Sequence, residues 1–533
     1  MSLPAVLRLF LTVLTIAAGA GAAAIPAMAG TLRASLSDDL TTIDPFAFPG
    51  LVSSGVLRQV YEGFTTIDAA GNAVPALATR WETPDGGRTW RFTLRPDVRF
   101  HSGRPFTAAD VLWTWEHHLT RKPQPGYSAF YLRGVEGAAA LQQGTAASLS
   151  GVAIPDSHTL IVRLSEPDAL FPLYPFLFVD RGMEAEFGPA WHERASGGTG
   201  PFRLTSWRRG ESVRLDAHAD YWGGAPAVDA VSLAVLPDTN TLLARYDAGE
   251  LDVAPLPENA VRTVVRQPRY DGQVAAFARA QVRYLALNQD LYPPFRDRRV
   301  REAVGLALDR VATVNGLHAG RAVLTNGFVT PGLGGYRPDT VPLPPTDPGR
   351  AKALLAEAGH AGGRGLPPLQ IAGGPNVREE ATYFAAQLTA VLGIPVGVRI
   401  QERAAFVAAI NEGHEALFIN GWTADFPDPM DQLATQWLGT SPTNRSRWHD
   451  PDFDRLMERA RGLAEPDARD ALYRDAEALL RDQVVAVPLA VPQFVALGRP
   501  GAARLVHRPY GAAGHHAARV ACRGAGPAVT ACT

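Results

Sequence analysis

The spacing of apolar residues changes repeatedly along this chain. Of all its sequence features, this one excludes the largest number of fold classes. In residues 89–94 and 160–164, apolar and polar side chains alternate with the two-residue period of a half-buried strand. Residues 107–110, Thr-Ala-Ala-Asp, read as a capping box that opens a helix. Residues 468–481 then place apolar side chains at helical spacing. Because strands and helices are interleaved, the sequence predicts a mixed α/β fold.

Residues 1–29 are typical of a secretory signal peptide rather than of a folded segment. Arg8 supplies the positive start, residues 9–18 form the apolar run, and residues 27–29, Ala-Met-Ala, form the cleavage site. A membrane helix is the alternative, but the run is short and no stop-transfer charges flank it. Gly30 follows the cleavage site where a lipoprotein would carry cysteine, and residues 1–29 contain no twin-arginine pair. We therefore expect Sec-type export of a protein without a lipid anchor to the periplasm.

The composition excludes several kinds of chemistry. A formal net charge of −2 over 533 residues gives no basic surface for nucleic acid. Only Lys122 and Lys352 are lysines, so 49 of the 51 basic residues are arginines, and neither lysine follows a glycine as a P-loop requires. The two cysteines, Cys522 and Cys532, lie at the extreme C-terminus, which excludes a cysteine nucleophile in the body. No cofactor is expected.

The tail and the histidines give no clear metal site. Residues 506–533 show little periodicity and leave three interpretations open: a small loop closed by a disulfide between Cys522 and Cys532, a disordered extension, or the product of a frameshift. His117 and His118 are adjacent on the predicted helix and point about 100° apart, so we expect surface histidines rather than metal ligands. No metal is predicted.

A series of short motifs occurs in a fixed order along the chain. They are Tyr61-Glu62-Gly63-Phe64, Phe100-His101-Ser102-Gly103, Gly198-Thr199-Gly200-Pro201-Phe202, Tyr221-Trp222-Gly223-Gly224, Ala248-Gly249-Glu250-Leu251-Asp252 and Gly421-Trp422-Thr423-Ala424-Asp425-Phe426-Pro427-Asp428-Pro429. The series resembles the extracytoplasmic solute-binding proteins of peptide-type ABC importers, the dipeptide- and oligopeptide-binding proteins of bacterial solute-binding family 5. The resemblance covers roughly residues 35–495 and agrees with the signal peptide.

This resemblance implies a two-lobed clamp of the class II periplasmic-binding type, with mixed sheets and three domains. The implied division is a discontinuous domain I (30–60, 197–287 and 487–505), domain II (61–196), domain III (288–486) and the divergent tail. Chain crossings near Asn288 and Pro488 would form the hinge, and ligand would lie between the lobes. The implied protein is a monomer that delivers its solute to a membrane permease and ATPase complex, and it is not an enzyme.

Asp425 is the strongest candidate for a ligand-binding residue. In peptide-binding relatives the aspartate of the Gly-Trp-x-x-Asp motif holds the ligand's α-ammonium group. A carboxylate in a closed cleft makes a strong charge-assisted hydrogen bond, which suits that role. The local sequence alone, with Pro427 two residues further on, favours a helix cap or turn aspartate, and it is the family resemblance that favours the ligand role. Asp428, in an Asp-Pro turn, is expected to be structural.

Aromatic residues near that motif and near the N-terminus are further candidates. Trp422 would form a flat wall against a peptide, or be a core residue, and Phe426 is a weaker case of the same kind. Phe46 and Phe48 follow Ile-Asp-Pro in a loop that approaches the cleft in the family, with simple loop packing as the alternative.

Three more residues are candidates on weaker grounds. Tyr127, after Pro-Gly, loosely matches a cleft tyrosine of oligopeptide-binding relatives. Asn444 and Arg445 belong to a polar loop that could face the ligand.

The sequence does not place a partner for a peptide's C-terminal carboxylate. Residues 417–420, Leu-Phe-Ile-Asn, are uncharged where some relatives carry arginine. Longer peptides therefore remain possible, as do other ligands of the family such as nickel chelates, glutathione, opines or oligosaccharides. A sensory receptor that reports to another partner is also open. A secreted hydrolase is disfavoured, because the chain has no Gly-x-Ser-x-Gly and no His-Glu-x-x-His motif.

Overall fold

The structure is a computed structural model that describes most of the chain beyond its first 29 residues. It describes residues 30–47, 51–67, 73–122, 128–333, 336, 345–499, 502, 506–507 and 519–520. The predicted signal peptide and the side chains of Phe48, Tyr127, Cys522 and Cys532 lie outside the described residues.

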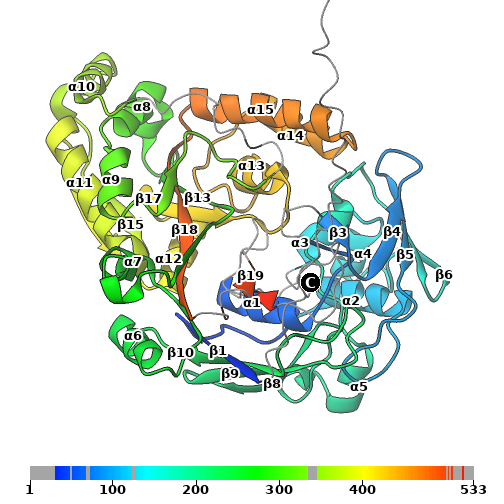
Figure 1. Cartoon of the computed structure of the whole chain (residues 1–533). Coiled ribbons are helices and arrows are strands. Elements are labelled where there is room, and N and C mark those ends of the chain that lie inside the picture. Colours follow the sequence, from blue (N-terminus) through cyan, green and yellow to red (C-terminus); the bar gives the residue numbers. More distant parts are fainter. Residues whose placement is uncertain are drawn as a thin grey trace, which may run out of the picture.

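One mixed sheet runs through the middle of the molecule (Figure 1). Its main path is β16-β15-β17-β13-β18-β11-β1-β10-β9-β8, and β12 and β14 also pair with β18. β1 is parallel to β10 and β11, and β15 is parallel to β16 and β17, while the other pairs are antiparallel. Its strands are β1 (Thr31–Leu36), β8 (Phe202–Arg208), β9 (Ser212–Ala217), β10 (Ala230–Val235), β11 (Val253–Pro255), β12 (Val274–Ala278), β13 (Gln281–Leu287), β14 (Ala322–Leu324), β15 (Leu369–Gly373), β16 (Val396–Ile400), β17 (Leu417–Thr423) and β18 (Ala486–Gly498).

The strand β18 connects the two halves of this sheet. It is almost wholly buried along its 13 residues, as its run of apolar side chains predicts for a strand covered on both faces. Ala278 of β12 pairs with Gln493, whereas Arg283 of β13 pairs with Ala490. The chain therefore passes between the halves at residues 279–280 and 491–493, eight or nine residues before Asn288 and three to five residues after Pro488, where the crossings were expected.

A smaller antiparallel sheet lies to one side of the main sheet, with strand order β4-β5-β7-β6. Its strands are β4 (Ala78–Glu82), β5 (Thr89–Leu94), β6 (Val152–Asp156) and β7 (Thr159–Arg163), and a separate hairpin joins β2 (Thr65–Ile67) to β3 (Ala73–Pro75). The predicted strand at 89–94 is confirmed as β5. The Asp85 carboxylate accepts the amide of Thr89 at 2.7 Å and closes the turn between β4 and β5.

Helix starts follow the caps that the sequence carries. The predicted capping box is present, because the side chain of Asp110 accepts the amide of Thr107 at 2.9 Å at the start of α2. Aspartate caps followed by proline open α10, α13 and α14. The helices are α1 (Leu51–Val60), α2 (Ala108–Thr120), α3 (Ala129–Leu132), α4 (Ala138–Gln143), α5 (Gly182–Phe187), α6 (Thr239–Asp247), α7 (Glu258–Val264), α8 (Arg298–Leu306), α9 (Arg310–Gly316), α10 (Pro348–Glu357), α11 (Arg378–Leu392), α12 (Arg403–Glu412), α13 (Pro429–Trp437), α14 (Pro451–Arg461) and α15 (Pro466–Asp482). The short pair β19 (Val506–His507) and β20 (Arg519–Val520) follows.

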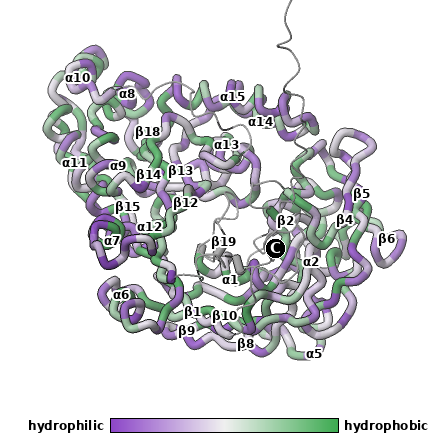
Figure 2. The backbone as a smooth tube through the Cα atoms, in the orientation of Figure 1, coloured by the Kyte–Doolittle hydropathy of each residue, from purple (hydrophilic) through white to green (hydrophobic). Residues whose placement is uncertain are grey.

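Several apolar cores hold these layers together. α1 packs through Val56, Leu57 and Val60 against the half of the sheet that contains β1, β8 and β10. α8, α10 and α11 cover the half that contains β13, β15 and β17. Figure 2 shows that β18 is largely hydrophobic, whereas hydrophobic and hydrophilic residues alternate along outer helices such as α10 and α14. The interleaved helices and strands confirm the predicted mixed α/β class.

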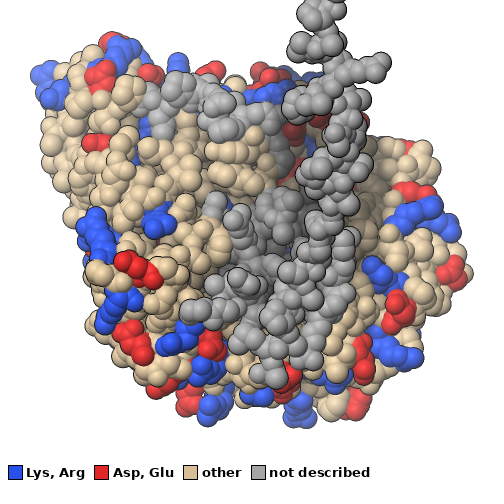
Figure 3. Space-filling model, viewed as in Figure 1, with Lys and Arg blue, Asp and Glu red and all other residues tan. Residues whose placement is uncertain are grey.

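The surface is mixed in charge. Figure 3 shows basic and acidic side chains interspersed along the lower rim of the visible face, without a broad field of one sign. Among the described residues, no helix is long and apolar enough to cross a membrane.

Candidate ligand-binding site

Asp425 lies in a short loop between β17 and α13. The loop ends where the Asp428 carboxylate caps α13 by accepting the amide of Met430 at 2.9 Å. Asp428 is buried, accepts the hydroxyl of Tyr473, and pairs with Arg469 at 3.1 Å. Asp428 thus has the expected structural role, and it fixes the end of the loop that carries Asp425.

A buried carboxyl group, Asp431, orients the two main candidate residues. Its Oδ2 atom accepts the indole N–H of Trp422 at 2.8 Å and the backbone amide of Asp425 at 2.9 Å. Burial and, secondarily, the nearby charge of Asp425 raise the pKa of Asp431 well above its usual value. Asp431, in the first turn of α13, therefore holds the indole of Trp422 and the backbone of Asp425 in position.

Asp425 and Phe426 contact aromatic residues that come before residues 279–280, where the chain first passes between the two halves of the main sheet. The hydroxyl of Tyr131, on α3, donates to the Asp425 carboxylate at 3.0 Å. Phe426 is buried edge-on to Tyr174, with ring centres 5.2 Å apart, and Tyr174 lies 4.9 Å from Tyr131. The backbone amide of Ala169 also donates to the carbonyl of Arg461 at 2.8 Å. Segments far apart in sequence are thus joined beside the loop of Asp425.

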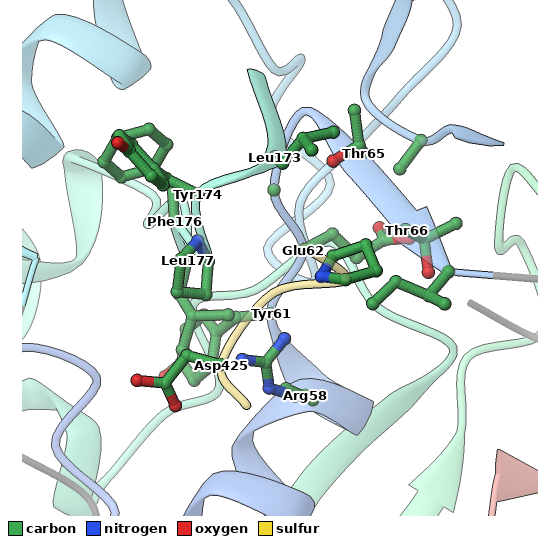
Figure 4. Close-up of a pocket in the computed structure, with 15 residues that line it drawn as sticks. Arg58, Tyr61, Glu62, Thr65, Thr66, Leu173, Tyr174, Phe176, Leu177 and Asp425 are labelled. Atoms are coloured by element: carbon green, nitrogen blue, oxygen red, sulfur yellow. The ribbon is translucent and has the colours of Figure 1, made fainter. Parts of the chain in front are cut away.

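A pocket opens next to this junction. Figure 4 shows Asp425 and Arg58 at one end of it, with Leu173 and Thr65 toward the other. Of the described residues that line it, Asp425 and Pro427 come from the part of the chain beyond residue 280. The wall also includes Arg58, Tyr61, Glu62, Gly63, Thr65, Thr66, Ile67, Ala76, Leu173, Tyr174, Pro175, Phe176 and Leu177. The pocket is therefore shared by segments on both sides of the crossing.

Glu62, in the Tyr-Glu-Gly-Phe motif, joins three of the motifs that defined the resemblance. Its buried carboxylate accepts the hydroxyls of Thr199 and Tyr221, both at 2.7 Å, and the indole N–H of Trp222 at 3.0 Å. Sequence reasoning gave Glu62 no role. The signal available was the recurrence of these motifs in order, which here reflects a hydrogen-bonded cluster behind the pocket wall.

A second pocket shares Tyr174 with the first. Phe426 lines it together with Phe130, Tyr131 and Tyr174, and Met430 and Leu438 add apolar surface. Among the predicted site residues, the structure thus brings Asp425 to the first pocket and Phe426 to the second, with Trp422 held beside them.

The other described candidates occupy structural positions. Phe46 is buried against α2, with its ring centre 4.4 Å from that of His117, and it lines neither pocket. The Asn444 amide nitrogen donates to the carbonyl of Trp448 at 2.6 Å and holds its own loop together. Arg445 donates to the side chain of Asn411 at 2.9 Å, and it also lines neither pocket.

The expectation that both helix histidines lie on the surface was wrong. His118 is 1% exposed, with its ring 4.8 Å from that of Phe46. Burial, with a smaller effect of His117, lowers the pKa of His118 to about 3, so the ring is neutral. The error arose because helical spacing alone does not show that the loop carrying Phe46 packs over the face of α2 that contains His118.

Comparison with known proteins identifies the class. The chain is similar to probable di/tripeptide-binding protein 5 of Pseudomonas aeruginosa, with 30% identity, covering 91% of this chain and 95% of the relative. It is also similar to heme-binding protein A of Haemophilus influenzae, with 27% identity over 88% and 89% of the two chains. The solved structure of the Escherichia coli murein tripeptide binding protein MppA matches 89% of this chain and 95% of its own, with a TM-score of 0.76 and 25% identity.

Fold and relatives together define a two-lobed extracytoplasmic solute-binding clamp. The family model for bacterial extracellular solute-binding proteins, family 5 Middle, matches residues 72–444. The chain belongs to this family, as its motifs predicted.

Proposed function

We propose that this protein is the periplasmic receptor of an ABC importer and that it captures short peptides between two closing lobes. The observation that carries the proposal is the position of Asp425, which reaches a pocket walled mostly by the other part of the chain and accepts a hydrogen bond from Tyr131. A ligand held there contacts both lobes, so binding favours the closed clamp. The family membership and the peptide-binding relatives support the same function.

In this proposal the lobes follow the domain division expected from the sequence. Domain I comprises 30–60, 197–287 and 487–505, domain II comprises 61–196, and domain III comprises 288–486. The hinge is the pair of crossings at 279–280 and 491–493, so residues 281–287 and 487–490 of this division would move with domain III. The two lobes would rotate about these strands as ligand enters and leaves.

The proposed roles of the site residues follow from their chemistry. The Asp425 carboxylate binds the peptide's ammonium group by a charge-assisted hydrogen bond in the closed cleft. Trp422 and Phe426 supply apolar walls beside it. Phe48 and Tyr127, which lie outside the described residues, are also proposed to contact the ligand. Binding involves no bond making or breaking, so the protein is proposed not to be an enzyme.

The remaining proposals concern location and partners. The signal at residues 1–29 would direct Sec export, and the mature protein would remain without a lipid anchor in the periplasm. There it would act as a monomer and deliver peptide to an inner-membrane permease driven by ATPases.

The first test is native mass spectrometry of the mature protein purified from its own periplasm, followed by denaturation to release ligand. A set of short peptide masses is the expected result. A single non-peptide mass, such as heme or a metal chelate, would contradict the peptide assignment while leaving the clamp intact.

The second test is titration of an identified peptide into wild type and the D425N variant. Removing one partner of a buried charge pair weakens binding by about 2–5 kcal/mol, roughly 30- to several-thousand-fold. The matched control is D271N, at an exposed aspartate outside both pockets, which should bind as wild type does. Equal affinities for D425N and D271N would contradict the role of Asp425.

A further inference from the structure

Among the described residues that line the pocket of Asp425, one is an arginine, Arg58. Arg58 stands in the last turn of α1, and its Nε atom is buried. Within the part of the chain that the structure describes, this Nε–H has no hydrogen-bond partner and the guanidinium makes no ion pair. A buried donor of a permanently charged group is unfavourable unless something binds it, so this position calls for an acceptor.

The neighbouring carboxylates already have other donors. Glu62 lies one turn further along the chain but accepts from Thr199, Tyr221 and Trp222. Asp425 accepts from Tyr131, and no N–O distance between Arg58 and Asp425 falls within 4.0 Å. Figure 4 shows Arg58 and Asp425 at the same end of the pocket, below Tyr61.

Arg58 is also not needed to complete the end of its own helix. The carbonyl of Leu57 accepts the amide of Tyr61 at 2.8 Å, and the carbonyl of Val60 accepts the amide of Gly200 at 2.9 Å. These bonds satisfy carbonyl groups that a C-terminal arginine could otherwise bind. The guanidinium therefore remains available to the pocket.

We propose that Arg58 binds the carboxylate of the peptide whose ammonium group Asp425 binds. This inference rests on the proposed function and assigns the anchor that residues 417–420 do not supply. The guanidinium offers paired N–H donors that match the two oxygens of a carboxylate. Because Arg58 precedes the crossing at 279–280 and Asp425 follows it, only the closed clamp brings both charges to one ligand.

A peptide that joins these two groups has to place both of its termini in this one pocket. An extended chain spans about 3.3–3.6 Å per residue, so each added residue moves the two termini further apart. Peptides of two or three residues are therefore the ligands to test first.

The test uses calorimetric titration of a di- or tripeptide with a free carboxylate and of the same peptide with a C-terminal amide. Wild type should bind the acid about 10- to 100-fold more tightly than the amide, as expected for a hydrogen-bonded charge. R58Q should lose this preference by weakening the acid alone, and R58K should keep part of it. R80Q, at an exposed arginine on β4, is the matched control and should keep the full preference.

Each other outcome overturns the assignment. If R58Q weakens the acid and the amide equally, Arg58 supports closure rather than the carboxylate. If R58Q changes neither, the carboxylate lies elsewhere. If wild type binds neither an identified periplasmic peptide nor its amide, the proposed function fails and this inference fails with it. Peptide binding without a preference for the acid contradicts only the role of Arg58.

Discussion

Replacing Arg283 with methionine tests whether a buried ion network holds the two halves of the main sheet together. Arg283 lies on β13 and is 5% exposed. Its guanidinium pairs with Glu258 of α7 at 2.5 Å and with Glu380 of α11 at 3.2 Å. α7 packs beside β11 and β12, while α11 packs on the half that contains β13. The network thus spans the crossing at residues 279–280.

The size of the effect follows from the carboxylates that the substitution leaves without a partner. Burial alone would raise the pKa of Glu258, but Arg283 and then Arg279 outweigh it and lower this pKa to about 2. The difference from the usual 4.5 corresponds to roughly 3 kcal/mol at about 1.36 kcal/mol per pH unit. Removing one partner of a buried ion pair costs about 3–5 kcal/mol in general, and the value obtained from the pKa of Glu258 agrees with this range. We expect R283M to lose this amount of unfolding free energy at pH 7.

The pH dependence supplies the sharper check. Because the folded-state pKa of Glu258 is lowered, its contribution is complete above about pH 4.5 and is lost as the pH falls toward 2. The difference between wild type and R283M should therefore stay constant from pH 7 to about pH 4.5 and shrink as the pH falls further toward 2, measured by urea unfolding with tryptophan fluorescence and circular dichroism. R245M is the control, because Arg245 pairs with Glu250 in the open, with 40% and 53% exposure, and should lose at most about 1 kcal/mol. A loss for R283M no larger than that for R245M would refute the reasoning.

Three other substitutions test the surroundings of the site. E62Q should lose about 1–3 kcal/mol of unfolding free energy, because an amide cannot accept from all three donors; unchanged urea unfolding would contradict the cluster. G198A should lose about 3 kcal/mol or more and yield little soluble protein, because an added Cβ would lie 1.8 Å from the carbonyl oxygen of Val60; normal expression and melting would contradict this contact. D431N should have a higher melting temperature than wild type at pH 8 but not at pH 4. The pKa of Asp431 is raised in the folded state, so ionisation of this carboxyl group destabilises the wild-type fold as the pH rises. An equal difference in melting temperature between D431N and wild type at both pH values would contradict a buried charge at this position.

The parts of the fold that depend on neighbours in sequence could be predicted. The capping box of α2, the proline starts of α10 and α14 and the strand at 89–94 each form from a few adjacent residues, so their patterns are sufficient. The family motifs supplied the class and the position of Asp425.

The rest of the site depends on long-range contacts that no spacing reveals. Glu62 meets Thr199 and Trp222 across 137 and 160 residues of chain. Nothing in the local sequence of Arg58 sets it apart from the 48 other arginines, and its place beside Asp425 in the pocket appears only in the fold. Asp431 is close in sequence to Asp425, but its role arises only when α13 turns back beside β17.

The position of β18 has a consequence for how the chain reaches its final form during synthesis. β18 supplies the shared strand of both sheet halves, yet it begins only at residue 486. Neither half can complete its hydrogen bonding until the ribosome has made almost the whole chain, and pairings this distant form slowly. The nascent polypeptide therefore stays unfinished for most of its translation. For a protein proposed to be exported through a channel that threads unfolded chains, this late completion would keep it competent for transport until the end.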